Sequence, residues 1–195
     1  MLGTMNFRSL YAHGFARVAA VTHPIALADP MTNAERVLES MRELHDEGVA
    51  AAVYPELNLC GYSVEDLVMQ DVLLDDVLRA IAAVVDGSRG LTPVAVIGAP
   101  IRKGQRLYNC AVVVKEGEVL GVVPKSYLPN YREFYEKRWY AFGEDQRGEH
   151  VDLGEELGEV PFGPDLIFRA LDLPDLAIHV EICEDVWVPI PPSSE

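Results

Sequence analysis

Three residues with reactive side chains lie where three separate apolar segments of the sequence end. Glu56 follows an apolar run in YPELNLCGY, Lys125 follows another in GVVPKSYLP, and Cys183 ends a third in HVEICEDVW. A carboxylate that accepts a proton, a cation that stabilises an oxyanion and a thiol that attacks carbon can together cleave a carbon–nitrogen bond through a thioester. These residues therefore predict an amidase-type site.

The residues that precede Glu56 predict a strand–helix–strand unit. Residues 15–21 form a β-prone apolar run, and a pattern of helical periodicity begins after Asp29 and Pro30. The nearly all-apolar run 49–55 is typical of a strand buried on both faces, and it leads directly into Glu56.

A second helical region is predicted over residues 64–85, with a weak capping box formed by Ser63 and Asp66. Further strands are expected at 93–100, 107–114, 119–124, 166–170 and 176–183, of which the third ends before Lys125 and the last ends at Cys183. The acidic, glycine-rich stretch 144–163 is expected to be a solvated loop or a surface hairpin. This order of elements predicts an α/β layered fold, in which ligands gather beyond the carboxyl ends of strands.

The composition limits the class of protein. A chain of 195 residues with 49% hydrophobic residues is expected to form one domain over residues 1–195. With 16 basic and 31 acidic residues the net charge is −15, which argues against binding to nucleic acid or to anionic membranes. The sequence has no secretory-type start and no apolar run near the roughly 20 residues of a membrane span. Three cysteines are too few to suggest a disulfide framework, and a cytoplasmic location is expected.

The three cysteines differ in their surroundings. Cys110 lies inside an apolar run and Cys60 in a turn-like segment, so both are predicted to be unreactive. Cys183 has carboxylates as neighbours, which disfavour its thiolate, so its chemistry needs a base. Glu56 is the candidate, because its largely apolar neighbours would leave the carboxylate poorly solvated and hence more basic.

Together these segments resemble the nitrilase superfamily of carbon–nitrogen hydrolases. YPELNLCGY is similar to that family's apolar-Pro-Glu-Leu-x-x-x-Gly-Tyr block, VVPKSYLPNYREFYEKR to its Lys-x-x-Leu-Pro block and HVEICEDVW to its Cys-Glu-Asp block. A closer resemblance, carried also by AHGFARVAAVTHP, SVEDLVMQD and EICEDVWVPIPPS, is to the glutaminase (amidase) domains of glutamine-dependent NAD synthetases. Those domains hydrolyse glutamine to glutamate and ammonia. A separate synthetase domain then uses the ammonia and ATP to amidate nicotinic acid adenine dinucleotide.

The resemblance implies a role for each reactive residue. Glu56 would be the general base, Lys125 the oxyanion stabiliser and Cys183 the nucleophile that forms a glutamyl thioester. Four further positions match supporting residues of the family: Glu136 as the glutamate that orients the lysine, the backbone N–H of Glu184 as a second oxyanion donor, and Tyr62 and Tyr131 as aromatics of the glutamine pocket.

The resemblance also implies an α-β-β-α sandwich, usually assembled into homo-oligomers. The chain ends twelve residues after Cys183 (195 − 183 = 12), whereas the family's sandwich continues well beyond the nucleophile. We therefore expect a C-terminally truncated sandwich, an incomplete glutaminase domain and poor activity of this chain alone.

The sequence contains no Ser-Gly-Gly-x-Asp-Ser string and no Walker-type loop, so the synthetase domain is expected to be absent. No cofactor is expected in this domain, and ATP and Mg are implied only for the synthetase domain. The spacing of His and Cys predicts no metal site.

Two alternatives stay open at this stage. The chain could be a free-standing nitrilase-family amidase that acts on another small amide, or it could be a scaffold domain without catalytic activity.

Overall fold

The computed structural model describes residues 9–173 and 175–194. In this part of the chain a seven-stranded sheet has the order β1-β2-β3-β4-β5-β7-β6, and a separate pair is formed by β8 and β9. The strands are β1 Val18–Ala20, β2 Ala51–Val53, β3 Val94–Lys103, β4 Arg106–Lys115, β5 Glu118–Pro124, β6 Glu149–Asp152, β7 Glu159–Phe162, β8 Ile167–Arg169 and β9 Ala177–His179. The α-helices are α1 Pro30–Asp46 and α2 Asp71–Gly87, and short 3-10 turns are η1 Leu10–His13, η2 Tyr62–Met69, η3 Glu136–Arg138, η4 Cys183–Val186 and η5 Pro192–Ser194.

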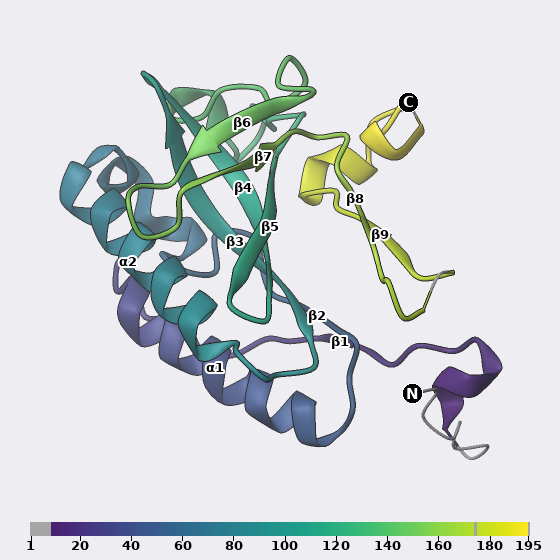
Figure 1. The fold of residues 1–195 in the computed structure, drawn as a ribbon. Helices are drawn as coiled ribbons and strands as arrows, with labels where there is room; N and C mark the ends of the chain where they lie inside the picture. Colours follow the sequence, from purple (N-terminus) through teal and green to yellow (C-terminus); the bar gives the residue numbers. More distant parts are fainter. Residues whose placement is uncertain (1–8, 174, 195) are drawn as a thin grey trace.

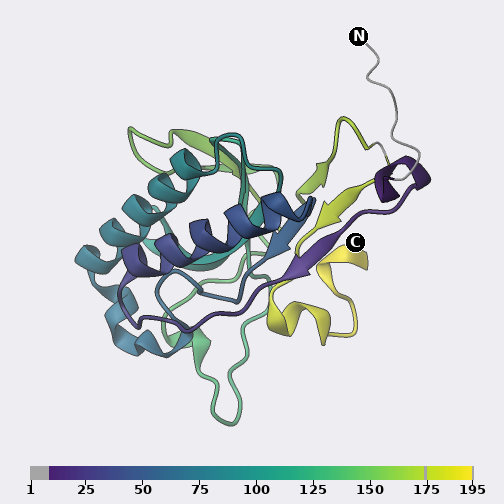
Figure 2. The same ribbon diagram turned by 90° about the horizontal axis from the view of Figure 1, so that it is seen from below.

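The elements form layers. Helices α1 and α2 lie side by side on one face of the large sheet, and the β8–β9 hairpin and the C-terminal turns lie on its other side (Figures 1 and 2). The α/β class predicted from the sequence is confirmed.

The strand directions bring two of the reactive residues to one edge of the sheet. Strands β1, β2 and β3 are parallel, and β3, β4 and β5 follow as an antiparallel meander, so β5 runs parallel to β3. The carboxyl ends of β2 and β5 therefore share an edge. Glu56 lies in the turn that follows β2, and Lys125 comes directly after β5.

Helix α1 begins where the sequence predicts. The Asp29 side chain accepts a hydrogen bond from the backbone N–H of Thr32 at 3.1 Å, and Pro30 occupies the first turn, where a missing N–H has no consequence. Val37 and Met41 on its inner face are fully buried.

The second helical region differs from the prediction of one helix over 64–85. The 3-10 segment η2 and helix α2 are separated by Gln70, whose backbone is extended with φ −81° and ψ 127°. The segment η2 is itself interrupted at Glu65, where a φ of +49° is incompatible with a helix. The capping box is also wrong: the Asp66 carboxylate accepts hydrogen bonds from the Arg138 guanidinium and the Trp139 indole N–H instead.

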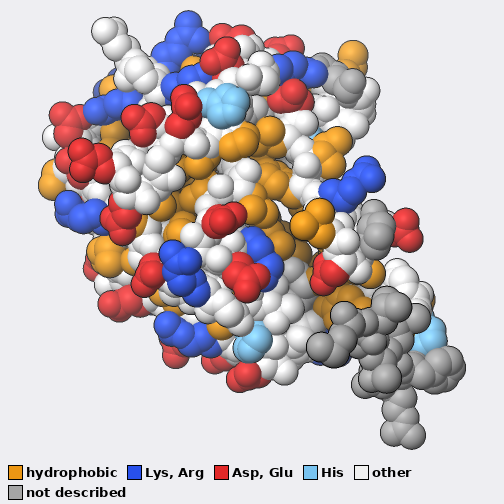
Figure 3. Space-filling view, in the orientation of Figure 1, with side chains coloured by type: hydrophobic (Ala, Val, Ile, Leu, Met, Phe, Trp, Pro, Cys, Tyr) orange, Lys and Arg blue, Asp and Glu red, His pale blue; other side chains and the backbone are white. Residues whose placement is uncertain are grey.

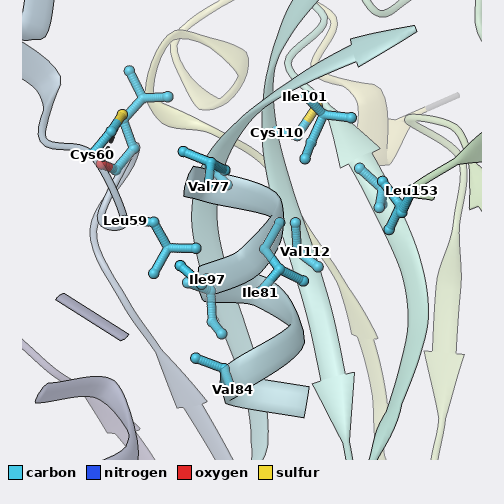
Figure 4. Packing of buried hydrophobic residues seen from close by; sticks show 14 of the residues in the cluster. Leu59, Cys60, Val77, Ile81, Val84, Ile97, Ile101, Cys110, Val112 and Leu153 are labelled. Carbon is cyan, nitrogen blue, oxygen red and sulfur yellow. Dashed lines mark hydrogen bonds between the residues drawn. The ribbon is translucent and has the colours of Figure 1, made fainter. Parts of the chain in front are cut away.

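The main core lies between α2 and the sheet (Figure 4). Val77, Ile81 and Val84 of α2 face the sheet residues Ile97 and Val112, and all five are buried. Burial of each such side chain contributes about 1.5–3 kcal/mol, so this layer gives the sheet a rigid support.

The two cysteines predicted to be unreactive lie within this core. Cys60 and Cys110 are buried, and burial raises the pKa of the Cys60 thiol to about 12 and that of Cys110 well above its usual value.

The acidic stretch 144–163 forms a hairpin, β6–β7, which was one of the two predicted forms. It is less solvated than expected, because Phe162 pairs with Val122 of β5 and packs edge-on against Tyr108 with ring centroids 5.3 Å apart. The hairpin thus extends the main sheet.

The C-terminal strands are shorter than predicted, as is β1. Strand β9 ends at His179, so Cys183 does not end a strand; it begins the turn η4. The residues in between extend along the second face of the sheet, where Ile182 is buried against an apolar cluster that includes Val96, Val113 and Val123.

The second face of the sheet is only partly covered. Val53 is 48% exposed although its neighbour Ala52 is fully buried, because successive strand residues point to opposite faces. A cavity of about 800 Å³ lies between the β8–β9 hairpin and the sheet and is lined by residues that include Leu120, Ile167 and Ile178. Hydrophobic side chains gather around a hollow on this side of the molecule (Figure 3). No helix in the described residues is long and apolar enough to cross a membrane.

Candidate amidase site

Glu56 is held at the sheet edge by a tight turn. The turn passes so close to β3 that a Cβ on Gly98 would lie 2.3 Å from the Leu57 nitrogen and 2.4 Å from the Pro55 oxygen. Only glycine fits at position 98, since any other residue would displace the backbone on either side of Glu56.

Lys125 lies in the middle of a group of carboxylates. Its Nζ is 2.6 Å from Oε1 of Glu56 and 2.9 Å from both carboxylate oxygens of Glu136. The lysine side chain is fully buried, that of Glu136 is 1% exposed and that of Glu56 is 17% exposed. Burial alone would lower the pKa of Lys125, but Glu56 and Glu136 outweigh it and raise this pKa, so the lysine stays charged.

Tyr62 joins this group from the segment η2. Its hydroxyl donates a 2.6 Å hydrogen bond to Oε1 of Glu136. Burial raises the pKa of Glu136, whereas Lys125 and the Tyr62 hydroxyl act in the opposite direction. Tyr62 therefore contacts the carboxylate that holds the lysine, a contact that its prediction as a pocket aromatic did not include.

Asn109 is a member of the site that the sequence analysis missed. From β4, its Nδ2 donates a 2.6 Å hydrogen bond to Oε1 of Glu56, and its backbone carbonyl accepts the N–H of Lys125 at 2.8 Å. One strand residue thus orients the glutamate and fixes the lysine backbone. An isolated polar residue in the apolar run LYNCAVVV was the available signal, because buried polar side chains need partners.

Cys183 approaches this group from the C-terminal segment. It has a φ of +47°, in the left-handed region that non-glycine residues rarely adopt, and such strained conformations cluster at functional sites. Burial raises the pKa of its thiol and the charge of Glu56 raises it further, while Lys125 lowers it. The thiol therefore lies within the electrostatic reach of both residues and is protonated at neutral pH.

The residues next to Cys183 make two kinds of contact. The Tyr131 hydroxyl donates to the Glu184 carboxylate at 3.0 and 3.3 Å, at the exposed rim of the site. Asp185, which the sequence analysis did not single out, is 2% exposed and accepts three backbone N–H groups.

An aromatic residue between the two predicted pocket tyrosines was also missed. The Phe134 ring lies edge-on to Tyr62 and to Tyr131, with ring centroids 6.5 and 6.1 Å away. The predicted residues thus fall into one region: Glu56, Lys125, Glu136 and Tyr62 in direct contact, Cys183 within electrostatic reach, and Tyr131 and Glu184 paired beside it. The 800 Å³ cavity lies elsewhere, and none of these residues lines it.

The site offers no grouping for a metal. Among the described residues, no three His, Cys, Asp or Glu side chains are arranged to hold one. The arrangement instead combines a thiol, a carboxylate and a buried cation, which is suited to covalent cleavage of an amide.

An α/β fold that carries these groups at one sheet edge has the architecture of a carbon–nitrogen hydrolase. The family model described as "Carbon-nitrogen hydrolase" matches residues 17–190. The chain belongs to this family, as the resemblance implied.

Within this family, the chain is similar in sequence to glutamine-dependent NAD(+) synthetases. The chain is 56% identical over 191 residues to the glutamine-dependent NAD(+) synthetase of Mycobacterium tuberculosis (strain ATCC 25618 / H37Rv), covering 98% of this chain and 28% of the relative. It is 33% identical over 168 residues to that of Thermotoga maritima, covering 86% of this chain and 25% of the relative. The chain thus spans little more than a quarter of the length of these relatives.

Solved structures support the fold. A glutamine-dependent NAD(+) synthetase from Cytophaga hutchinsonii matches with a TM-score of 0.75 and 25% identity, covering 87% of this chain and 28% of that one. An amidase from Nesterenkonia sp. matches with a TM-score of 0.66 over 89% of this chain and 57% of that one; at 20% identity it supports the fold alone. The nitrilase-like fold class is confirmed.

Proposed function

We propose that this protein hydrolyses the side-chain amide of glutamine to glutamate and ammonia through a thioester on Cys183. The observation that carries the proposal is the fully buried Lys125 ammonium, fixed between the carboxylates of Glu56 and Glu136. A buried, immobilised cation that is bonded to a carboxylate and acts electrostatically on a thiol can stabilise negative charge that appears only in the transition state.

The first half-reaction forms the thioester. Glu56 accepts the thiol proton as Cys183 Sγ attacks the amide carbon, and the carbonyl electron pair moves onto oxygen. Because the pKa of Cys183 is raised, the thiol needs this base. Lys125 and the backbone N–H of Glu184 stabilise the oxyanion. When the carbonyl re-forms, the carbon–nitrogen bond breaks, and ammonia leaves with the proton from Glu56.

The second half-reaction hydrolyses the thioester. Glu56, again ionised, takes a proton from a water molecule as the water oxygen attacks the thioester carbon. The carbon–sulfur bond then breaks, glutamate is released, and Cys183 regains its proton. Glu136 and Asn109 act through other residues: Glu136 orients Lys125, and Asn109 orients Glu56.

The partner in this proposal is a synthetase domain. The relatives that cover 98% of this chain are glutamine-dependent NAD(+) synthetases, so we assign residues 1–195 to a glutaminase unit that supplies ammonia to such a domain. ATP and Mg would serve that domain.

The test measures ammonia release from glutamine by the intact protein. Cys183→Ser and Glu56→Gln are expected to lower kcat by about 10³-fold or more, because nucleophile and base act in one step. Glu118→Gln, which changes an exposed glutamate on β5, should leave kcat unchanged. Faster hydrolysis of aliphatic amides than of glutamine would favour the free-standing amidase.

Labelling separates an enzyme from a scaffold. Iodoacetamide should modify the exposed Cys183 faster than the buried Cys60 and Cys110, and Glu56→Gln should lower the rate of labelling at Cys183 itself. If Cys183 were labelled at the same rate in the wild type and in Glu56→Gln, the proposed pairing of base and nucleophile would be wrong.

A further inference from the structure

The Asp185 side chain joins two segments that are far apart in the sequence. Its Oδ1 accepts the backbone N–H groups of Ser126 at 3.1 Å and Tyr127 at 2.8 Å, and its Oδ2 accepts the N–H of Ile182 at 3.0 Å. The residue is 2% exposed. One carboxylate thus satisfies three donors, on two separate stretches of backbone.

These two stretches of backbone adjoin the proposed oxyanion stabiliser and the proposed nucleophile. Ser126 directly follows Lys125, and Ile182 directly precedes Cys183. The carboxylate therefore sets the distance between a backbone point beside the lysine and a backbone point beside the thiol. In return, the N–H of Asp185 donates to the Ile182 carbonyl at 3.1 Å, which closes the turn that carries Cys183.

Other hydrogen bonds also connect the residues around Cys183 to the residues that follow Lys125, but they are weaker. In the described residues these are the bond from the Tyr127 hydroxyl to the Ile190 carbonyl at 3.4 Å and the bonds from Tyr131 to Glu184, and all are exposed. Exposed bonds compete with water and constrain a turn little. The strained φ of Cys183 requires a firm hold, since it costs free energy that its surroundings must offset.

We infer that Asp185 is a positioning residue that holds the Cys183 thiol within reach of Glu56 and Lys125. This inference rests on the proposed function and deepens it, because it names what aligns nucleophile and base. A displacement of about 1 Å at such a distance can lower the rate by about 10²-fold.

The test is a double-mutant cycle in the intact protein with iodoacetamide as the probe of Cys183. Asp185→Asn keeps the shape, but one of its two terminal atoms becomes a donor, so it can accept from only one of the two segments. In the wild-type background Glu56→Gln should slow the labelling of Cys183 by about tenfold or more, because the loss of the base that takes the thiol proton during attack outweighs the lower thiol pKa that follows from the loss of the Glu56 charge. In the Asp185→Asn background the same change should slow it by less than about threefold, because the thiol no longer meets the base.

Glutamine hydrolysis gives a second readout. Asp185→Asn should lower kcat by about 10²-fold and change KM by less than about threefold. The matched control is Asp152→Asn, which alters an exposed aspartate that also accepts a backbone N–H, that of Gly154 at 2.9 Å, in the β6–β7 hairpin. This control should leave labelling, kcat and KM unchanged.

The outcomes distinguish the proposed function from the proposed positioning role of Asp185. If Glu56→Gln does not slow labelling even in the wild-type background, the proposed function fails. If Glu56→Gln slows labelling equally in both backgrounds, only the role of Asp185 is overturned. If Asp185→Asn does not fold, the same labelling cycle is measured with Asp185→Glu. This variant keeps both acceptor oxygens but displaces them by one methylene, so Glu56→Gln should again slow labelling by less than in the wild-type background. If neither variant folds, Asp185 serves the fold and the inference is wrong.

Discussion

The lysine side of the site and the cysteine side differ in how much of the molecule holds them. Glu56, Lys125 and Glu136 are bonded to one another and to residues of the helix-covered sheet. Cys183 lies on a turn after a hairpin of two three-residue strands, and on that hairpin Leu171 is 98% exposed.

This difference separates two tasks of the proposed enzyme. Charge stabilisation requires groups that do not reorganise during the reaction, and the packed side of the molecule provides them. The nucleophile needs placement only, and two residues beside it connect it to the sheet: the buried Asp185 carboxylate by hydrogen bonds and the buried Ile182 side chain by apolar packing. The cysteine side should therefore be the more easily disturbed of the two.

The largest effect is expected from removal of the central cation. Lys125→Met leaves the buried carboxylate of Glu136 and the partly buried carboxylate of Glu56 without a counter-charge, which should cost about 3–5 kcal/mol in the free energy of unfolding. The kcat for glutamine hydrolysis should fall by about 10³-fold. Urea unfolding and an ammonia assay measure the two effects.

A partly buried lysine elsewhere serves as the control. Lys115 donates a hydrogen bond to the Leu91 carbonyl at 2.8 Å, and Lys115→Met should cost about 1 kcal/mol with kcat unchanged. If Lys125→Met hydrolysed glutamine at the wild-type rate, the lysine side of the site would have only a structural role. The two sides would then not differ in the way proposed.

The second largest effect is expected in the pH dependence of the free energy of unfolding, to which Asp185 on the cysteine side contributes. Burial raises the pKa of Asp185 from 3.8 to about 6, partly opposed by the N–H groups of Ile182 and Tyr127. The folded protein then binds this proton more tightly than the unfolded chain, so the stabilisation is complete below pH 4 and is lost as pH rises through 6. This rise in pKa corresponds to about 3 kcal/mol.

The measurement compares wild type with Asp185→Asn by urea unfolding between pH 4 and 7. The difference in the free energy of unfolding should shift by about 3 kcal/mol against the wild type over this range. A constant difference would mean that Asp185 is ionised throughout, with its three N–H bonds outweighing burial, and the cysteine side would then be as firmly held as the lysine side.

The smallest effect compares one tyrosine on each side. Tyr62→Phe removes a 2.6 Å bond to the buried Glu136, and kcat should fall by about tenfold. Tyr131→Phe removes an exposed bond to Glu184, and kcat should fall by less than about threefold. The reverse order in an ammonia assay would mean that the rim contributes more to the chemistry than the buried group.

Much of the fold could be predicted because its signals are local. The start of α1 at Asp29 and the apolar strands β3, β4 and β5 follow from residue type and spacing within a few positions. The interruptions at Glu65 and Gln70 could not be predicted, because the periodicity of the segment continues across them and the contacts of Asp66 come from residues more than 70 positions away.

The sequence by itself determined the reactive residue types, the positions of Glu56 and Lys125 near strand ends and the family motifs around all three residues. The tertiary structure decided which of them touch. The contacts from Lys125 to Glu56, from Tyr62 to Glu136 and from Asp185 to Tyr127 span 69, 74 and 58 positions. Local periodicity carries no information about such pairs, since they depend on the order of strands in the sheet and on the burial of polar groups that must then find partners.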